Sequence, residues 1–135
     1  MITERREFDA NLEALDGLLE FIAALTQDFS GKVSYNITLV CEEIFVNVTK
    51  YAYPDGAGRL AIVWENDREN RKLRIEFEDS GIPFNPLLKE PPRLDVPISQ
   101  RQIGGLGIVI VRELMDSVHY DYVDGKNRLT VTKEY

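Results

Sequence analysis

The sequence predicts an α+β fold in which helices cover one face of a mixed, mostly antiparallel sheet, forming a two-layer sandwich. Helical periodicity lies early in the chain, between residues 10 and 51, and the alternating patterns typical of strands follow later and close together. At 135 residues the chain has the length of one ordinary domain with its own core. We therefore expect a single domain over residues 1–135.

Two long helices are expected near the start of the chain. In residues 10–29 apolar side chains recur at intervals of three and four, and the same period continues in residues 32–51. The turn sequence Tyr-Pro-Asp-Gly at residues 53–56 ends the second helix. Residues 1–8 form a short segment that could add an edge strand.

The alternation of apolar and polar residues predicts four strands, and the last two form a hairpin turned at residues 124–127. A third helix is expected from Gly104 to Met115. Five of the six prolines fall from Pro83 to Pro97, and proline excludes a regular helix or a central strand. A compact domain carries so long an irregular loop mainly as a lid or binding loop, so we expect a flexible lid over residues 84–103. The four strands span residues 59–65, 72–78, 118–123 and 128–135.

Composition and charge exclude several classes of protein. Sixteen Lys and Arg against 23 Asp and Glu give a net charge of −7, which argues against binding to nucleic acid or to an anionic membrane. The lone Cys41 cannot close an intrachain disulfide, and the lone His119 excludes a histidine-rich metal site. No apolar run approaches the roughly 20 residues that span a bilayer, and the charged first residues are unlike a signal peptide. We expect a cytoplasmic protein.

The first candidate site residues lie in the second helix. Glu43 and Asn47 are four residues apart and share one face of it, whereas Glu42 lies about 100° away around the helix. A carboxylate can accept a proton from a hydroxyl, and an amide oxygen is a hard ligand for Mg²⁺. The alternative is an ordinary solvated helix face.

Two further motifs contain glycine. Asp79 and Gly81 follow the strand at residues 72–78, where a carboxylate can accept from the amino edge of a purine; the alternative is a surface turn. Gly104-Gly105-Leu106-Gly107 opens the third helix, where backbone N–H groups can approach an anion. This motif is neither a Walker loop nor G-x-G-x-x-G, and its alternative role is a hinge with a close helix contact.

Taken in order, the three motifs resemble the N box, G1 box and G2 box of the Bergerat ATP-binding fold. Histidine kinases, type II topoisomerases and a mismatch-repair ATPase share this GHKL-type, histidine-kinase-like fold. The resemblance extends over about residues 34–135. The stretches EEIFVN, DSGIPFNP and GGLGIVIVRELMD look most like bacterial anti-sigma-factor serine/threonine kinases, in which the whole chain is the ATP-binding domain.

The resemblance implies a role for each matched residue. Glu43 is expected to be the general base and Asn47 a ligand of Mg²⁺. Asp79 is expected to accept a hydrogen bond from the adenine amino group, with Gly81 permitting that approach. The residues expected near the phosphates are Gly105, Gly107 and, from the lid, Arg101.

Two positions stay open. Either Thr130 or Thr132 supplies a hydroxyl near adenine, and the sequence does not choose between them. At Tyr51 the family usually has a histidine or another basic residue, so one contact on the phosphate side is in question; Lys50 is the alternative source of charge.

The resemblance implies that the protein is a kinase. It would transfer the γ-phosphoryl of ATP, with Mg²⁺, to a Ser or Thr of an anti-sigma-factor antagonist and would hold a sigma factor inactive; a homodimer is left open. Two alternatives are a non-catalytic, ATP-gated binding switch and a detached ATPase domain of a histidine kinase. The only histidine, His119, follows the third motif, so autophosphorylation within the chain is not expected.

Overall fold

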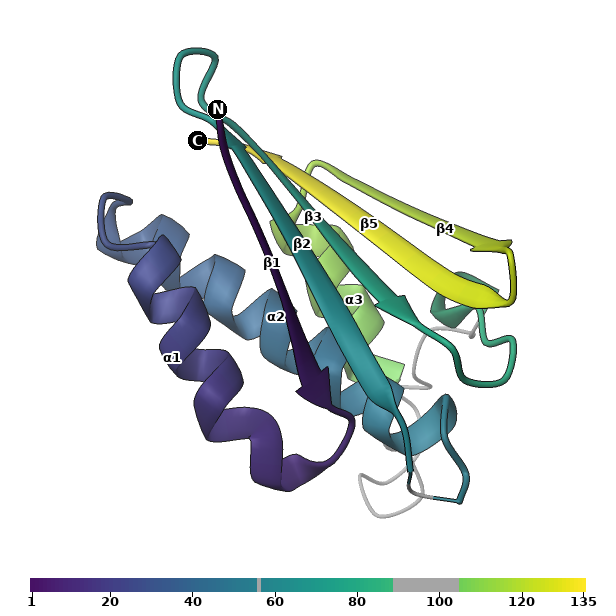
Figure 1. The fold of residues 1–135 in the computed structure, drawn as a ribbon. Coiled ribbons are helices and arrows are strands. Elements are labelled where there is room, and N and C mark those ends of the chain that lie inside the picture. The colour runs from purple at the N-terminus through teal and green to yellow at the C-terminus, as the bar shows by residue number, and fades with distance from the viewer. Residues whose placement is uncertain (56, 89–104) are drawn as a thin grey trace, which may run out of the picture.

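The computed structural model describes residues 1–55, 57–88 and 105–135. In this part of the chain three helices lie on one face of a five-stranded sheet (Figure 1), so the predicted two-layer α+β arrangement is confirmed. The helices are α1 (Leu15–Leu25), α2 (Gly31–Tyr51) and α3 (Gly105–Leu114). α2 lies between the other two and packs against both.

The strand order of the sheet is β1-β2-β3-β5-β4. All neighbouring strands in the described residues are antiparallel, so the predicted mixed sheet is wrong in this respect. The crossover through α3 does bring β4 back parallel to β3, but β5 lies between these two strands and separates them. The strands are β1 (Ile2–Asp9), β2 (Arg59–Asp67), β3 (Lys72–Asp79), β4 (Ser117–Val123) and β5 (Lys126–Glu134).

The first helix is shorter than the sequence predicts. A 3₁₀ turn at Leu12–Ala14 precedes α1, and Asn11 caps this turn by accepting from a backbone N–H at its end. α1 ends at Leu25. Phe29, predicted to continue the helix, instead packs its ring against Tyr135 with 4.4 Å between centroids. Tertiary packing of an aromatic ring thus overrides the helical period here.

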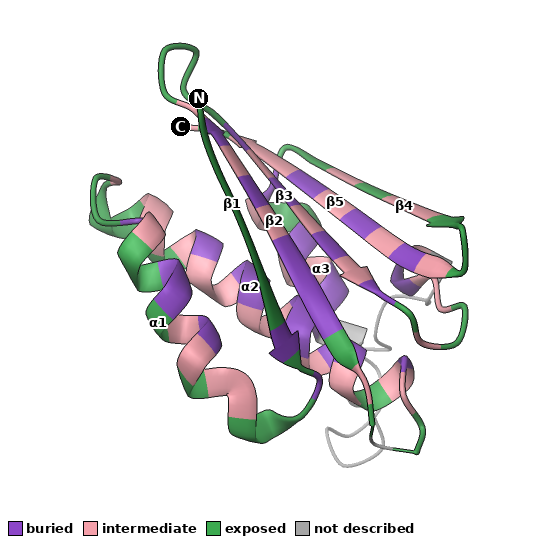
Figure 2. Cartoon of the chain, in the orientation of Figure 1, coloured by how far each residue is buried: buried purple, intermediate pink, exposed green. Residues whose placement is uncertain are grey.

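The core lies between the sheet and the helices (Figure 2). Alternate residues of β2 and β3 point into it as predicted, and each such large side chain contributes about 1.5–3 kcal/mol by its burial. Cys41 of α2 belongs to this core, and burial raises the pKa of its thiol to about 12, so it is not a nucleophile at neutral pH. The large core residues that alternate along β2 and β3 are Leu60, Ile62, Trp64, Leu73, Ile75 and Phe77.

The final hairpin turns on two residues, Asp124 and Gly125, both of which have positive φ (56° and 76°). The turn is therefore shorter than the predicted four residues, and Lys126 and Asn127 belong to β5. In the pairing of β5 with β3, Asn127 lies opposite Asp79, the last residue of β3.

Candidate functional site

The facing sides of α2 and α3 bring the first and third motifs together. Asn47 is buried, Glu43 is half-buried, and both lie against Gly107 of α3. A methyl group on Gly107 would lie 2.6 Å from Oε2 of Glu43 and 3.6 Å from Nδ2 of Asn47. The missing side chain at Gly107 thus leaves room for the Glu43 carboxylate.

The side chain of Asn47 fits a role as a ligand for a metal or phosphate. It is only 6% exposed, yet within the described residues it makes no hydrogen bond. Its amide atoms are not among the fully buried, unpaired side-chain atoms of the described residues, so the amide oxygen is open to a ligand. Mg²⁺ commonly takes one or two protein oxygens and completes its shell with waters and phosphates. The described part of the chain contains no cluster of three His, Cys, Asp or Glu side chains that would hold a metal alone.

Asp79 closes the other side of the site. It is 6% exposed, and its Oδ1 accepts from the Gly81 N–H and from Nδ2 of Asn127, each at 2.9 Å. Burial raises the pKa of Asp79, and these two hydrogen bonds offset part of the rise. Oδ2 accepts no hydrogen bond within the described residues, so it is the oxygen left for a ligand.

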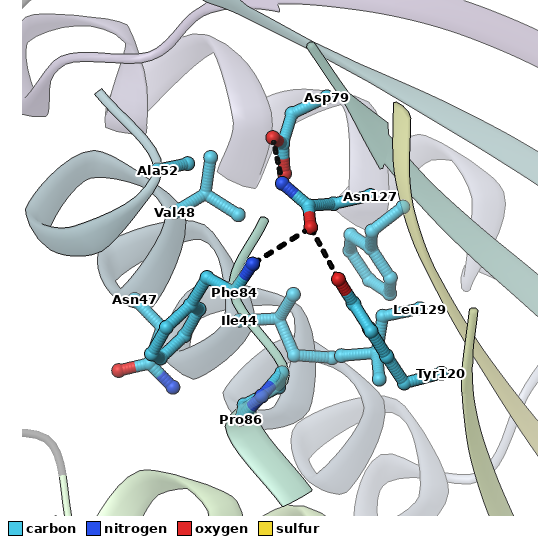
Figure 3. A pocket seen from close by; sticks show the side chains of 11 residues that line it. Ile44, Asn47, Val48, Ala52, Asp79, Phe84, Pro86, Tyr120, Asn127 and Leu129 are labelled. Carbon is cyan, nitrogen blue, oxygen red and sulfur yellow. Dashed lines mark hydrogen bonds between the residues drawn. The ribbon is translucent and has the colours of Figure 1, made fainter. Parts of the chain in front are cut away.

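A cavity of about 30 Å³ lies between Asp79 and Asn47 (Figure 3). It has room for about one water, whereas pockets for larger ligands measure about 300–1,000 Å³. Phe84 and Pro86 form part of its wall, so an adenine ring fits only after the segment that carries them has moved. The other apolar lining residues are Ile44, Val48, Ala52, Phe77 and Leu129.

Gly81 makes its closest contact with the protein itself. A methyl group at this position would lie 2.2 Å from the carbonyl oxygen of Ala52, just after α2, and the Ile82 N–H donates to the same oxygen at 2.9 Å. Besides any approach to a ligand, Gly81 therefore permits the end of α2 to pack against the end of β3.

We expect Gly81→Ala to lower the free energy of unfolding by about 1–3 kcal/mol, because backbone atoms must shift to admit the methyl group. Thermal or denaturant unfolding measures this. Gly17→Ala within α1 is the control: nothing lies within 4 Å of its added methyl, so it should keep or increase stability. A Gly81→Ala protein as stable as the wild type would contradict the contact.

Sequence reasoning missed Asn127. Its Nδ2 donates to Asp79, and its Oδ1 accepts from the Phe84 N–H and from the Tyr120 hydroxyl (Figure 3). Nδ2 also donates to the Ile82 carbonyl. The available signal was the Asp-Gly pair at the hairpin, because a two-residue turn would have placed Asn127 within the last strand, opposite Tyr122, instead of in the turn.

Neither threonine proposed to lie near adenine lines the cavity. Thr130 and Thr132 alternate along β5 with the buried Leu129 and Val131, so they belong to the opposite face of the sheet. The Thr132 hydroxyl forms its hydrogen bond with Ser117 of β4.

Tyr51, which stands where the resembled family usually has a basic residue, makes an aromatic contact instead. Its ring stacks on Phe84 with 4.9 Å between centroids and 21° between planes. Lys50 is exposed. Gly105 is the first residue of α3, whereas Arg101 and the predicted lid from residue 89 onward lie outside the described residues.

The site thus combines four features of known ATP-binding domains. They are a carboxylate and an amide on one helix, an aspartate at a strand end, and a glycine opposite the carboxylate. Over residues 8–133 the chain matches the histidine kinase-like ATPase domain. The chain belongs to this family. Membership in the histidine kinase-like ATPase domain family implies an ATP site, and the cavity between Asp79 and Asn47 is its candidate adenine pocket.

Known proteins resemble this histidine kinase-like ATPase domain in sequence and in fold. The serine/threonine-protein kinase BtrW of Bordetella bronchiseptica is 29% identical over 114 residues, which cover 84% of this chain and 79% of BtrW. The structure of the RsbU and RsbW domains of Rv1364c from Mycobacterium tuberculosis gives a TM-score of 0.66 at 12% identity, and the match covers 99% of this chain but only 32% of that one. Histidine kinase AdeS of Acinetobacter baumannii gives 0.54 at 16% identity, over 99% of this chain and 68% of AdeS.

No helix of the described residues combines the length and the apolar character needed to cross a membrane.

Proposed function

We propose that this histidine kinase-like ATPase domain is a protein kinase that phosphorylates a Ser or Thr of a partner protein. The observation that carries the proposal is the pair Glu43 and Asn47, one turn apart on α2 and both against Gly107, where a base and a ligand for Mg²⁺ would be needed. The likeness to the kinase BtrW supports the same reaction class.

In the proposed reaction the hydroxyl oxygen of the acceptor residue attacks the γ-phosphorus of ATP. The bond from this phosphorus to the oxygen that bridges to the β-phosphate breaks, ADP leaves, and Glu43 takes the hydroxyl proton. Asn47 would hold Mg²⁺, which supplies positive charge to the phosphates. Oδ2 of Asp79 would accept from the adenine amino group and so orient the nucleotide.

We further propose that the acceptor is an anti-sigma-factor antagonist and that a sigma factor is a second partner. The support is the resemblance of the three motifs to anti-sigma-factor kinases. The net charge of −7 also favours protein partners over nucleic acid.

A second candidate function is an ATP-gated switch without catalysis. Phe84 and Pro86 line the small cavity, so nucleotide binding has to move the segment that carries them, and a partner could sense that movement.

The test is to incubate the full chain with Mg-ATP and each candidate antagonist from the same genome, and then to locate phosphate by mass spectrometry. The kinase predicts one phosphate on a Ser or Thr of one candidate, lost when magnesium is chelated. ATP binding without transfer to any candidate would favour the switch, and no ATP binding would contradict both.

We expect Asp79→Asn to reverse the purine preference. Two donors hold Oδ1, so the amide oxygen should keep this place and the amide nitrogen should replace Oδ2, which puts a donor opposite the adenine amino group. ATP affinity should fall by about 5- to 150-fold, equivalent to about 1–3 kcal/mol. ITP, whose 6-oxo group is an acceptor, should lose less or gain. Calorimetry with both nucleotides measures this, and equal losses for ATP and ITP would count against Asp79 as the purine-reading residue.

A further inference from the structure

The side-chain amide of Asn127 uses all of its hydrogen-bonding positions to join three segments of the chain, and we call this arrangement the Asn127 junction. The residue is 5% exposed and bonds to the end of β3, to the loop after it and to β4 (Figure 3). Nδ2 donates at 2.9 Å to Asp79 and at 2.8 Å to the Ile82 carbonyl, while Oδ1 accepts from the Phe84 N–H and the Tyr120 hydroxyl. An amide offers two donors and two acceptor sites, so all four are in use. Asn127 therefore has no group left with which to bind a nucleotide directly.

The donor side of this amide sets the orientation of Asp79. Together with the Gly81 N–H, Nδ2 of Asn127 engages Oδ1 and leaves Oδ2 without a hydrogen bond in the described residues. A carboxylate held at one oxygen loses little further conformational freedom when a ligand binds the other oxygen. Oδ2 of Asp79, the oxygen proposed to bind the purine, is therefore already positioned before the ligand arrives.

The acceptor side holds the segment at the cavity. The Phe84 N–H donates to Oδ1 at 2.9 Å, and the Phe84 ring lines the cavity and stacks on Tyr51. Since an adenine ring needs this segment to move, the bonds from Asn127 to Ile82 and Phe84 are among those that must adjust when the pocket fills.

We propose that Asn127 is a positioning residue that couples purine recognition by Asp79 to the placement of Phe84 at the pocket. It acts through these residues and does not touch the nucleotide. The proposal rests on the proposed ATP site, and the experiment below separates the two.

Asn127→Asp tests the donor side alone. The shape and the acceptor side are kept, but the second oxygen then faces Oδ1 of Asp79 and the Ile82 carbonyl, which are both acceptors. Two carboxylates at this distance cannot both be ionised, so the pair retains one proton to a higher pH than an isolated carboxyl. With that proton on the substituted side chain one of the two donors is restored, and it can bond to Oδ1 of Asp79 while the Ile82 carbonyl loses its bond from this side chain; without the proton both bonds are lost. Among the described residues, Tyr53 and Tyr120 are in electrostatic contact with Asp79, and burial raises the pKa of both phenols, so neither ionises in the acid range.

The measurement is the affinity for ATP from about pH 5 to pH 9, the range in which buried carboxyls titrate, divided by the wild-type affinity at the same pH. We expect the relative affinity of Asn127→Asp to fall by about tenfold or more as the pH rises. Hydrogen exchange at the Phe84 N–H, divided by the wild-type rate at the same pH, should quicken over the same range. Asn127→Leu should be weak at every pH.

Asn66→Asp is the matched control. Asn66 is also buried, at 3% exposure, and its Oδ1 also accepts from a tyrosine hydroxyl, that of Tyr135, but it lies at the other end of β2 and β3. This variant should lower stability without any pH-dependent change in relative affinity.

Parallel pH profiles for Asn127→Asp and the wild type, or the same profile for Asn127→Asp and Asn66→Asp, would overturn the proposal. If the wild type binds no ATP, the proposed function fails. The Phe84 exchange rate of the nucleotide-free variant, divided by the wild-type rate at the same pH, then decides on the junction by itself: a ratio that rises with pH supports it, and a flat ratio overturns it.

Discussion

Glu43→Gln is expected to reduce phosphoryl transfer to the partner protein by about 10²–10⁴-fold, the usual contribution of a general base. Glutamine has nearly the same shape as glutamate but cannot take the hydroxyl proton at neutral pH. ATP affinity should change little, because Asn47 and Asp79 remain in place at the cavity. Single-turnover transfer and equilibrium binding of ATP together measure the separation of chemistry from binding.

Glu42→Gln is the control for this variant. Glu42 is the neighbouring residue of α2 and is half-buried like Glu43, so the two substitutions change the charge of the same helix turn equally. Gly107 lies against the carboxylate of Glu43. Transfer should survive in Glu42→Gln. A loss of the same size in both variants would indicate a general electrostatic effect, and an active Glu43→Gln would leave the ATP-gated switch as the better function.

Periodicity and spacing were sufficient to predict most of the fold. The alternation of apolar residues in β2 and β3 and their helical period in α2 follow directly from burial, because one face of each element packs against the core. The spacing of Glu43 and Asn47 also predicted their common face without knowledge of any other element. These features depend on a few residues of contiguous chain.

Features that depend on packing between distant segments were not predictable in the same way. The antiparallel neighbours of the sheet follow from β5 entering between β3 and β4, which no local pattern specifies. The role of Asn127 follows from strand register, and a turn assigned two residues too long concealed it. The contact of Gly107 with Glu43 likewise joins segments more than 60 residues apart.

Gly107→Ala is expected to reduce transfer by about 10²-fold while the domain stays folded. The added methyl group meets Oε2 of Glu43 at 2.6 Å, and this atom is the far end of a flexible side chain that can move aside. The fold therefore tolerates the change, and alanine is the better residue inside a helix by about 1 kcal/mol. A displacement of about 1 Å at a reacting group can cost about 10²-fold in rate.

A double-mutant cycle tests whether this loss passes through Glu43. If the methyl group acts by displacing the carboxylate, then Gly107→Ala should have little further effect in a Glu43→Gln background, because the base is already absent. If the two losses multiply, Gly107 acts by another route, such as the phosphate contact expected of it, and ATP affinity should then fall in Gly107→Ala as well. Gly81→Ala gives the opposite signature, because its methyl group meets the backbone of Ala52: stability should fall whether or not Glu43 is present. The two glycines thus separate a contact that positions a catalytic group from one that holds the fold together.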